Sequence, residues 1–440
     1  MNPLAQDLNI AIAAGNPHIV DMLSDMGKQL YFPKGILSQS AEAKQKAHKI
    51  NATIGIARQD NHVMNLGSMV SLVQEMDPET YLPYAPSFGI MELRTAWKAS
   101  LYEKNPSLSG KAISLPVVTC GITHAVSTFA DLWVNAGDTV LLPDMMWGNY
   151  SMTFCVRNRA KIKHYNTFTP DLKQMDLDAF EAAVKEEVRA CGKVIAVLNF
   201  PHNPTGYTVS VSEAHRMADI LISAASQGAD VVVACDDAYF GLFYEPETMS
   251  ESLFSLLAGA HERLVAVKLD GATKEEFAWG LRIGFITYGI RAGKGSDQIH
   301  DALEKKTAGC IRGCISNASH MGQSLVLQSL KSMDHARLKL EKFDILKDRA
   351  EAIRQELKSP GYSDAWDVYP FNSGYFMCIR LKDVDAETLR LHLLDNYGTG
   401  LIAIGAKNIR IAFSCLEKDD VPVLFDIILK GINDLRTKGA

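Results

Sequence analysis

The sequence predicts an α/β fold, in which a mostly parallel sheet covered by helices is joined to a smaller α/β unit. Between residues 90 and 290, short apolar segments rich in β-branched residues alternate with helical segments. The strand-like segments are apolar on both sides, which is typical of parallel strands covered by helices on both faces. After residue 290 a long helical region extends to about residue 357, and a second strand–helix–strand–helix pattern closes the chain.

The elements can be placed in order along the chain, with only weak helices before residue 85. The expected strands of the main sheet are 113–119, 139–142, 194–199, 230–234, 264–268 and 283–289, and the helices among them are 90–98, 124–133, 177–188 and 211–225. The closing unit comprises strand 375–381, helix 386–396, strand 409–414 and helix 421–437. We therefore expect an N-terminal arm with part of the small domain at 1–85, a large domain at 86–325 and a C-terminal small domain at 326–440.

Composition limits the class of protein. The chain has 440 residues, 47% hydrophobic and 22% charged, a balance typical of globular proteins with more than one domain. The net charge of −6 disfavours nucleic acid or an anionic membrane as a partner. No apolar run is long enough to span a bilayer, and residues 1–15 lack the features of a signal or transit peptide, so we expect a cytoplasmic location. The eight cysteines are scattered without a CxxC pair, which favours reduced thiols and indicates no metal site.

Ligands of open α/β sheets bind beyond the carboxyl ends of the parallel strands, so residues there are the first candidates for a site. The strand at 113–119 runs into Gly121-Ile122-Thr123 and then directly into a helix. A glycine allows close approach, and a helix N-terminus offers free N–H groups to a phosphate, although an ordinary strand-to-helix turn would look the same. After the next strand, Trp147 could stack on a planar ring or belong to the core.

Two further loops carry polar side chains. His202-Asn203-Pro204-Thr205-Gly206 has the composition of a tight turn, from which the Asn203 amide could donate to a phenolate oxygen. The strand at 230–234 is followed by Asp236, Asp237 and Tyr239. Two adjacent carboxylates near a buried strand end are unfavourable unless one has a cationic partner, and a protonated pyridine nitrogen would serve Asp236. We expect Asp237 to be exposed or to cap a helix.

The fifth loop, after the strand at 264–268, supplies Lys274 and, eight residues later, Arg282. A buried lysine with a lowered pKa is the usual nucleophilic amine of covalent catalysis. Arg282 could bind a phosphate, with Gly280 and Gly284 allowing the backbone to bend around it. An amine, a guanidinium, a carboxylate, a phenol and an amide at successive strand ends are the groups that bind pyridoxal phosphate and use it as an electron sink.

In order and spacing these segments resemble those of a class I aminotransferase, a fold-type I pyridoxal-phosphate enzyme, nearest to the aspartate and aromatic branch. The resemblance extends from Tyr81 to the last helix. The matching segments are Tyr81-Leu82-Pro83, Gly121-Ile122-Thr123, Trp147-Gly148-Asn149, His202 to Gly206, Asp236-x-Ala238-Tyr239, the spacing from Lys274 to Arg282, and Asn408 to Ser414. Of these, His202 to Gly206 is identical to the His-Asn-Pro-Thr-Gly of the family.

The resemblance implies a large domain of the seven-stranded type, a smaller α/β domain built from both ends of the chain, and pyridoxal 5′-phosphate as cofactor. The implied catalytic residues are Lys274, Asp236 and Tyr239. The implied cofactor-binding residues are Gly121, Ile122, Thr123, Trp147, Asn203, Asp236, Tyr239, Thr273, Lys274, Arg282 and, from the neighbouring subunit, Tyr81. The implied substrate-binding residues are Arg410, Arg312, Asn203, Trp147 and Gly67.

The expected substrate depends on two arginines. By resemblance, Arg410 pairs with the α-carboxylate of the substrate. Arg312, four residues before Ser316-Asn317, matches an arginine that crosses the dimer interface to a side-chain carboxylate, although it is equally compatible with a surface arginine on a helix. Together they would select aspartate, glutamate and their 2-oxo acids, whereas Arg410 alone would admit neutral or aromatic amino acids.

Three positions depart from the family pattern. Gly271 replaces a serine that donates to the phosphate, which leaves Thr273 as the nearest hydroxyl. Tyr150 replaces a histidine beneath the ring-nitrogen aspartate. The glycine-rich loop that closes over the substrate is matched only loosely, around Gly67.

The implied function is transfer of an amino group between an L-amino acid, with aspartate or glutamate expected, and a 2-oxo acid by a ping-pong mechanism. Lys274 would hold the cofactor and move the α-proton. A β-lyase or an amino-acid decarboxylase on the same scaffold stays open, since it shares Lys274, Asp236 and Tyr239. A non-enzymatic regulator is disfavoured because no basic DNA-binding segment precedes residue 60. A homodimer is expected because the residues that match Tyr81 and Arg312 serve the partner's site in the family.

Overall fold

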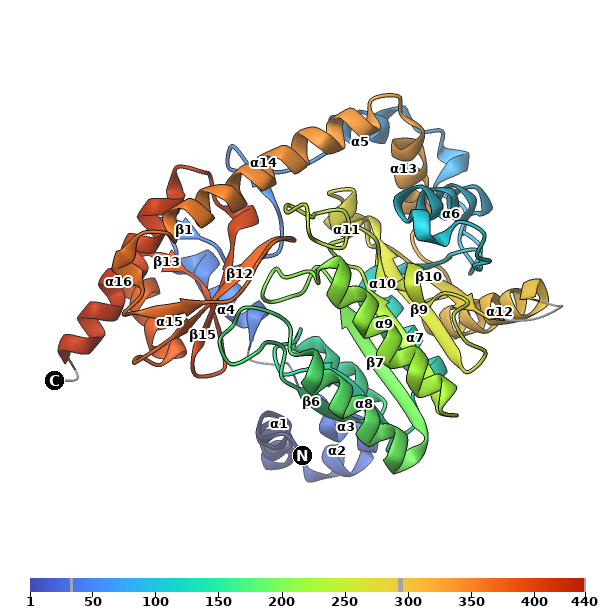
Figure 1. Ribbon diagram of the computed structural model, residues 1–440, viewed down its shortest axis with the longest axis horizontal. Helices are drawn as coiled ribbons and strands as arrows, with labels where there is room; N and C mark the ends of the chain where they lie inside the picture. The colour runs from blue at the N-terminus through green and yellow to red at the C-terminus, as the bar shows by residue number, and fades with distance from the viewer. Residues whose placement is uncertain (32–34, 292–295, 439–440) are drawn as a thin grey trace.

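The computed structural model describes residues 1–31, 35–291 and 296–438, and a seven-stranded sheet forms its centre (Figure 1). The strands are β4 (Val117–Cys120), β5 (Thr139–Pro143), β6 (Lys161–Tyr165), β7 (Lys193–Asn199), β8 (Asp230–Asp236), β9 (Leu264–Gly271) and β10 (Ile283–Ile290). Their order across the sheet is β4-β10-β9-β8-β7-β5-β6. All neighbours from β6 to β9 are parallel, and β10 is antiparallel to β9 and to β4. The predicted fold class is confirmed.

Alternate residues of the central strands face opposite sides of the sheet. In β7, Ile195 and Val197 belong to one apolar cluster together with residues of α7 (Gly121–Trp133). Val194, Ala196 and Leu198 belong to a second cluster, together with residues of α8 (Leu177–Cys191) and α9 (Val211–Ser226), the two helices in front of the sheet in Figure 1. Burial on both faces explains why these strands are continuous apolar runs rather than alternating ones.

Two strands of this sheet differ from the prediction. β4 begins at Val117, not at residue 113, because Pro116 has no N–H to donate to a ladder. Its carbonyl instead accepts a hydrogen bond of 2.7 Å from Arg94 Nε. β6 is absent from the predicted elements, since this edge strand carries exposed Lys161 and His164 and lacks the apolar pattern of the central strands.

The second sheet lies in the C-terminal part of the chain and is entirely antiparallel, in the order β11-β12-β15-β14. Its strands are β11 (Trp366–Val368), β12 (Phe376–Leu381), β14 (Ile402–Ile404) and β15 (Asn408–Ala412). The helices of this part are α15 (Ala386–Tyr397) and α16 (Asp420–Lys438). The predicted strands near 375–381 and 409–414 and the two predicted helices are present, while β11 and β14 are too short to have been predicted.

In its described residues, the predicted helical region between the two sheets contains three helices, α12 (Ser296–Cys314), α13 (His320–Lys331) and α14 (His335–Glu356). Figure 1 shows α14 as a long helix that runs from α13 to the C-terminal part of the molecule. Residues 32–34, 292–295 and 439–440, which fall in the predicted arm, helical region and C-terminal domain, lie outside the described residues.

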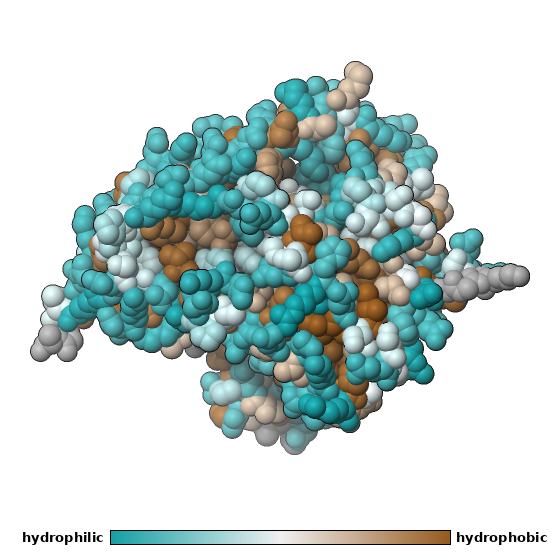
Figure 2. All heavy atoms as spheres, viewed as in Figure 1, coloured by the Kyte–Doolittle hydropathy of each residue, from teal (hydrophilic) through white to brown (hydrophobic). Residues whose placement is uncertain are grey.

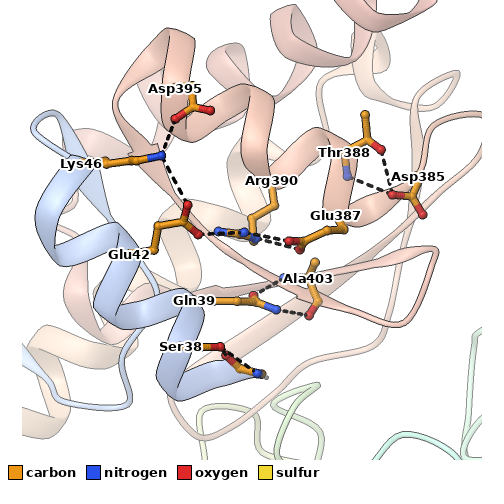
Figure 3. A network of polar contacts seen from close by, with 11 residues as sticks. Ser38, Gln39, Glu42, Lys46, Asp385, Glu387, Thr388, Arg390, Asp395 and Ala403 are labelled. Atoms are coloured by element: carbon orange, nitrogen blue, oxygen red, sulfur yellow. Dashed lines mark hydrogen bonds and ion pairs between the residues drawn. The ribbon is translucent and has the colours of Figure 1, made fainter. Parts of the chain in front are cut away.

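The N-terminal segment contacts the C-terminal part of the chain, where β1 and β13 form a separate two-stranded sheet. It contains α1 (Pro3–Gly15), α2 (Pro17–Met22), α3 (Asp25–Gln29), α4 (Ile36–Lys46) and β1 (Ile50–Asn51), which pairs with β13 (Thr399–Gly400). Figure 3 shows how α4 is fixed on α15: the buried Arg390 guanidinium contacts Glu42 at 3.0 Å and Glu387 at 2.8 Å. Gln39 exchanges two hydrogen bonds with the backbone of Ala403.

The remaining elements are short or peripheral. They are β2 (Arg58–Gln59), β3 (His62–Val63), α5 (Gly67–Glu75), α6 (Met91–Lys104), α10 (Leu253–Leu257), α11 (Ala272–Glu275), the π-helical segment η3 (Ser151–Arg157) and the 3-10 turns η1 (Pro78–Thr80), η2 (Pro106–Leu108), η4 (Trp279–Leu281), η5 (Pro360–Tyr362) and η6 (Phe413–Cys415). Hydrophilic residues predominate on the face shown in Figure 2. Within the described parts of the chain, no helix combines the length and the apolar character needed to cross a membrane.

Candidate active site

A pocket of about 480 Å³, including the part open to solvent, lies where β5, β7, β8 and β9 end and α7 begins. Its lining residues are Ile122, Thr123, Trp147, Tyr150, Asn199, Asn203, Asp236, Ala238, Tyr239, Thr273, Lys274 and Arg282. Five separate loops of the sequence therefore meet at one edge of the sheet, as the parallel strand order requires.

Lys274 enters this pocket from α11, the single helical turn that follows β9. Lys274 is half-buried, and its amine lies 4.8 Å from the centre of the Tyr239 ring. Burial, with a smaller contribution from Arg282, lowers the pKa of Lys274 to about 8, while the nearby charge of Asp236 opposes this shift. About a tenth of the amine is therefore uncharged at pH 7, far more than for an ordinary lysine, and a nucleophile or a base requires the uncharged form.

Asp236 is the last residue of β8, is buried and lines the pocket. Burial raises the pKa of its carboxyl to about 6, although a hydrogen bond of 2.6 Å from the Tyr150 hydroxyl favours the ionised form. Burial also raises the pKa of Tyr150, so this phenol stays protonated and donates. Trp147 packs edge-to-face on Tyr150 with the ring centres 5.4 Å apart. A buried carboxylate held in this way is suited to a cationic partner in the pocket.

Asn199 and Asn203 connect Asp236 to the C-terminal sheet. Asn199, the last residue of β7, donates to the Asp236 backbone carbonyl at 2.8 Å and accepts from the Asn203 N–H at 2.9 Å. The Asn203 side-chain oxygen accepts a hydrogen bond of 3.1 Å from Arg410 Nη1. The Asn203 NH₂ group is thus left to donate into the pocket.

Arg410 lies on β15 and is 1% exposed. Besides Asn203, it donates to the Thr53 carbonyl at 2.8 Å, and its guanidinium lies 4.1 Å from the centre of the Phe376 ring. Its Nε is buried without a hydrogen-bond partner. A buried guanidinium with an unused donor can accept a carboxylate at little further desolvation cost.

The opposite end of the pocket is shaped to receive an anion. Gly121 begins α7 in the left-handed region (φ +73), and a Cβ atom there would lie 2.4 Å from Arg282 Nη2, so a glycine lets the guanidinium reach the helix N-terminus. Thr273 Oγ1 is buried without a partner. The glycine at 271 is also explained, because a side chain there would come within 2.6 Å of the Ile283 carbonyl oxygen.

These groups fit pyridoxal 5′-phosphate. The unpartnered Thr273 hydroxyl, the α7 N-terminus and Arg282 can hold a phosphate, and Asp236 can hold a protonated ring nitrogen at the other end. Within the described chain, no group of three or more histidine, cysteine, aspartate or glutamate side chains is placed to hold a metal ion.

The family model of class I and II aminotransferases matches residues 47–428. The chain belongs to this family. It is 24% identical, over 348 residues, to a probable N-acetyl-LL-diaminopimelate aminotransferase of Bacillus subtilis, with 77% of this chain and 78% of the relative covered. It is 20% identical, over 355 residues, to an aspartate aminotransferase of Sulfurisphaera tokodaii, with 78% and 80% covered.

The fold is similar to that of an aminotransferase from Anaerococcus prevotii, with a TM-score of 0.83, 22% sequence identity, and 94% of this chain and 99% of that chain covered. As a member of the family, the protein is a pyridoxal-phosphate-dependent aminotransferase. The predicted family, enzyme class and cofactor are therefore confirmed.

Five predicted site residues of the aminotransferase do not line the pocket of a single chain. Gly121 adjoins Arg282 and Arg410 donates to Asn203, so these two lie next to lining residues, whereas the other three do not. Tyr81 is half-buried after η1, and Gly67 is the exposed first residue of α5. Arg312 is exposed near the end of α12, where it donates to Ser316 Oγ at 2.7 Å. Their roles stay predictions.

The expectation for Asp237 is wrong. The Asp237 carboxylate is neither exposed nor a cap: it is 4% exposed, accepts a hydrogen bond of 2.6 Å from Ser252 and pairs with the fully buried Lys268. Two buried carboxylates therefore lie at the end of β8: Asp236, its last residue, lines the pocket, and Asp237, which follows it, is held by Lys268 and Ser252.

Sequence reasoning missed Asn199, Thr53 and Phe376. Asn199 had a signal, because it ends an apolar strand four residues before Asn203. Thr53 contributes only its backbone carbonyl, and Phe376 resembles any core aromatic of a strand, so neither had one.

Proposed function

We propose that the aminotransferase moves the amino group of aspartate or glutamate to a 2-oxo acid by a ping-pong mechanism. The observation that carries the proposal is the half-buried Lys274, with its pKa lowered to about 8, in one pocket with Asp236 and Tyr239. When bound, pyridoxal phosphate supplies the electron sink for the α-carbon. The Lys274 amine takes the α-proton of the amino acid and returns it in the second part of the half-reaction.

The other residues bind and orient. The N–H groups at Ile122 and Thr123, the Thr273 hydroxyl and Arg282 would hold the phosphate. Asp236 would hold the ring nitrogen protonated, the Asn203 amide and the Tyr239 hydroxyl would donate to the phenolic oxygen, and the Trp147 indole would contact the ring. Arg410 binds the α-carboxylate of the substrate. The assignments are supported by the pocket lining and by the hydrogen bond from Arg410 to Asn203.

The substrate is tested by adding L-aspartate, L-phenylalanine or L-alanine to the cofactor-loaded protein and following its absorbance. Rapid conversion by aspartate alone supports the dicarboxylate assignment. Conversion only by phenylalanine or alanine would contradict it. Steady release of pyruvate or carbon dioxide without a 2-oxo acid acceptor would instead indicate a β-lyase or a decarboxylase. Lys274→Ala should abolish conversion, while Lys305→Ala, which removes an exposed lysine on α12, should not.

We also propose a homodimer in which Arg312 and Tyr81 serve the partner's site. A complementation experiment tests this arrangement. Lys274→Ala and Arg312→Ala chains are each expected to be inactive with aspartate. Re-associated in equal amounts, they form a heterodimer with one intact site, so about a quarter of the normal activity should return. No recovery, with both variants dimeric on size exclusion, would contradict the shared site. The cytoplasmic location and the domain limits at residues 85 and 325 stay predictions.

A further inference from the structure

Arg410 carries a charge that the fold buries among neutral groups. The residue is 1% exposed. In the described residues both of its hydrogen-bond acceptors are uncharged: the Asn203 side-chain oxygen lies 3.1 Å from Nη1, and the Thr53 carbonyl oxygen lies 2.8 Å from Nη2. Burial lowers the pKa of Arg410, yet a guanidinium in a protein keeps its proton. A buried charge is unfavourable unless another group compensates for it.

The ring of Phe376 supplies such a group. The guanidinium carbon of Arg410 lies over this ring, 4.1 Å from its centre, which is the shortest of the cation–ring distances in the described chain. Phe376 is 2% exposed, so solvent hardly screens the contact. The face of an aromatic ring is the negative part of its quadrupole, and it attracts a cation most strongly where both groups are desolvated.

The register of the C-terminal sheet brings the two side chains together. β12 and β15 are antiparallel neighbours, and Arg410 lies directly opposite Cys378 (Figure 1). Phe376 precedes Cys378 by two residues, so the three side chains share one face of the sheet. Diagonal neighbours of this kind are within reach of aromatic and long side chains. The contact between Phe376 and Arg410 therefore follows from the strand pairing.

Phe376 is also fixed by contacts that do not involve the guanidinium. Its ring packs edge-to-face on that of Tyr239, with the ring centres 5.4 Å apart. A Cβ atom at Gly55 would lie 3.1 Å from Phe376 Cζ, and one at Gly206 would clash with the Phe376 carbonyl oxygen. The backbone at both glycines thus packs closely against Phe376. The ring therefore presents a fixed face to the guanidinium.

We propose that Phe376 is a positioning residue of the carboxylate site, in which its ring face holds the Arg410 guanidinium in the orientation that receives the α-carboxylate of the substrate. The inference rests on the proposed role of Arg410. The hydrogen bonds to Asn203 and Thr53 act on the edge of the guanidinium, whereas the ring acts on its face, so together they restrict both its rotation and its tilt. Phe376 acts through Arg410 and not on the cofactor.

The test compares two amines that differ in one group, on the protein loaded with pyridoxal phosphate. 2-Methylalanine carries a carboxylate, tert-butylamine carries a methyl group in its place, and neither has an α-proton to transfer. Their binding is followed by the absorbance of the bound cofactor. Phe376→Leu keeps an apolar side chain but removes the ring face, so it should weaken the binding of 2-methylalanine about 10- to 30-fold, the factor expected for one desolvated cation–ring contact. The affinity for tert-butylamine and for pyridoxal phosphate should stay within about twofold of the native value.

Two matched replacements separate the charge of the ring from its volume. 3,5-Difluorophenylalanine at position 376 keeps the shape of the ring, makes its face less negative and leaves the para position beside Gly55 unsubstituted. It should weaken the binding of 2-methylalanine about threefold or more, and it replaces Phe376→Leu if that variant does not fold. Phe425→Leu removes a fully buried ring of α16 from the same apolar cluster and should leave both affinities unchanged.

The results separate this inference from the proposed function. If Arg410→Lys binds 2-methylalanine as tightly as the native protein, the proposed role of Arg410 is wrong. If Arg410→Lys loses that binding but Phe376→Leu keeps it, or weakens both amines equally, the positioning role of Phe376 is wrong. A loss in Phe376→Leu without one in the difluorinated protein would mean that the ring acts only by its volume, which also overturns the inference.

Discussion

The hydrogen bond from Tyr150 to Asp236 gives a quantitative prediction for Tyr150→Phe. Burial already raises the pKa of Asp236 to about 6, and the 2.6 Å bond from Tyr150 opposes that rise. A hydrogen bond to a charged group is worth about 1.5–3 kcal/mol, so its loss should raise the pKa of Asp236 by about 1 to 2 units. The phenylalanine leaves the ring volume filled, which limits the change to the missing hydroxyl.

The consequence is pH-dependent cofactor affinity. If the ring nitrogen binds only the ionised carboxylate, the affinity for the cofactor is proportional to the fraction of Asp236 that is ionised in the free protein. With a pKa near 7.5 in the variant and near 6 in the native protein, the dissociation constant should rise about 15-fold at pH 6 and by less than about twofold at pH 8. The sign follows from the direction of the shift, because a raised carboxyl pKa penalises binding only below that pKa.

The assay is fluorescence quenching of the apoprotein by pyridoxal phosphate at pH 6 and pH 8. Tyr369→Phe is the matched control, since it removes a hydrogen bond to Asn408 from a buried tyrosine outside the pocket. An equal loss of affinity at both pH values, or a larger loss at pH 8, would refute the reasoning. Such a result would mean that the Tyr150 hydroxyl acts on packing rather than on the ionisation of Asp236.

Three further predictions concern single residues. Gly121→Ala places a Cβ 2.4 Å from Arg282 Nη2, at a positive φ that costs an alanine about 1–2 kcal/mol. The apoprotein should therefore melt at a lower temperature, and fluorescence titration should show at least about tenfold weaker binding of the cofactor. Arg410→Lys loses the bidentate geometry and should lower kcat/KM about 100-fold for every amino acid in steady-state assays, with an unchanged cofactor spectrum. Asp237→Asn leaves the buried charge of Lys268 without its closest counter-ion, so the free energy of unfolding in urea should fall by about 3–5 kcal/mol. The double variant Asp237→Asn/Lys268→Met should lose less, because it removes both charges.

The central sheet could be predicted because its strands are buried on both faces, which leaves uninterrupted apolar runs such as 194–199 and 230–234 in the sequence. The location of the site could be predicted from the parallel order of these strands, because parallel strands bring their carboxyl ends to one edge of the sheet. The edge strand β6 could not be found, because Lys161 and His164 give it the composition of a loop. A proline at residue 116 could have corrected the start of β4, since it cannot donate to the ladder.

Other features have no local signal at all. The carbonyl of Thr53 meets Arg410 across 357 residues of sequence, and a backbone oxygen is the same in every residue. Asp237 can be buried because Lys268 and Ser252, which are 31 and 15 residues away, contact its carboxylate. The residues next to Asp237 in the sequence therefore do not predict its burial. Tyr81 and Arg312 are predicted to act in a second subunit, and the sequence of one chain does not determine the position of that subunit.

The pairing of the N-terminal segment with the C-terminal sheet has a consequence for synthesis on the ribosome. Glu42 and Arg390 are 348 residues apart, and β1 cannot pair until residues 399–400 have been made. The central sheet and the phosphate end of the pocket are complete in sequence by residue 290 and can form while translation continues, since domains fold as units as they emerge. During that time residues 36–58 lack the C-terminal residues that they contact in the folded protein. The contact between Thr53 and Arg410 is therefore among the last to form, so a nascent chain can gain its cofactor cradle before it can bind an amino acid.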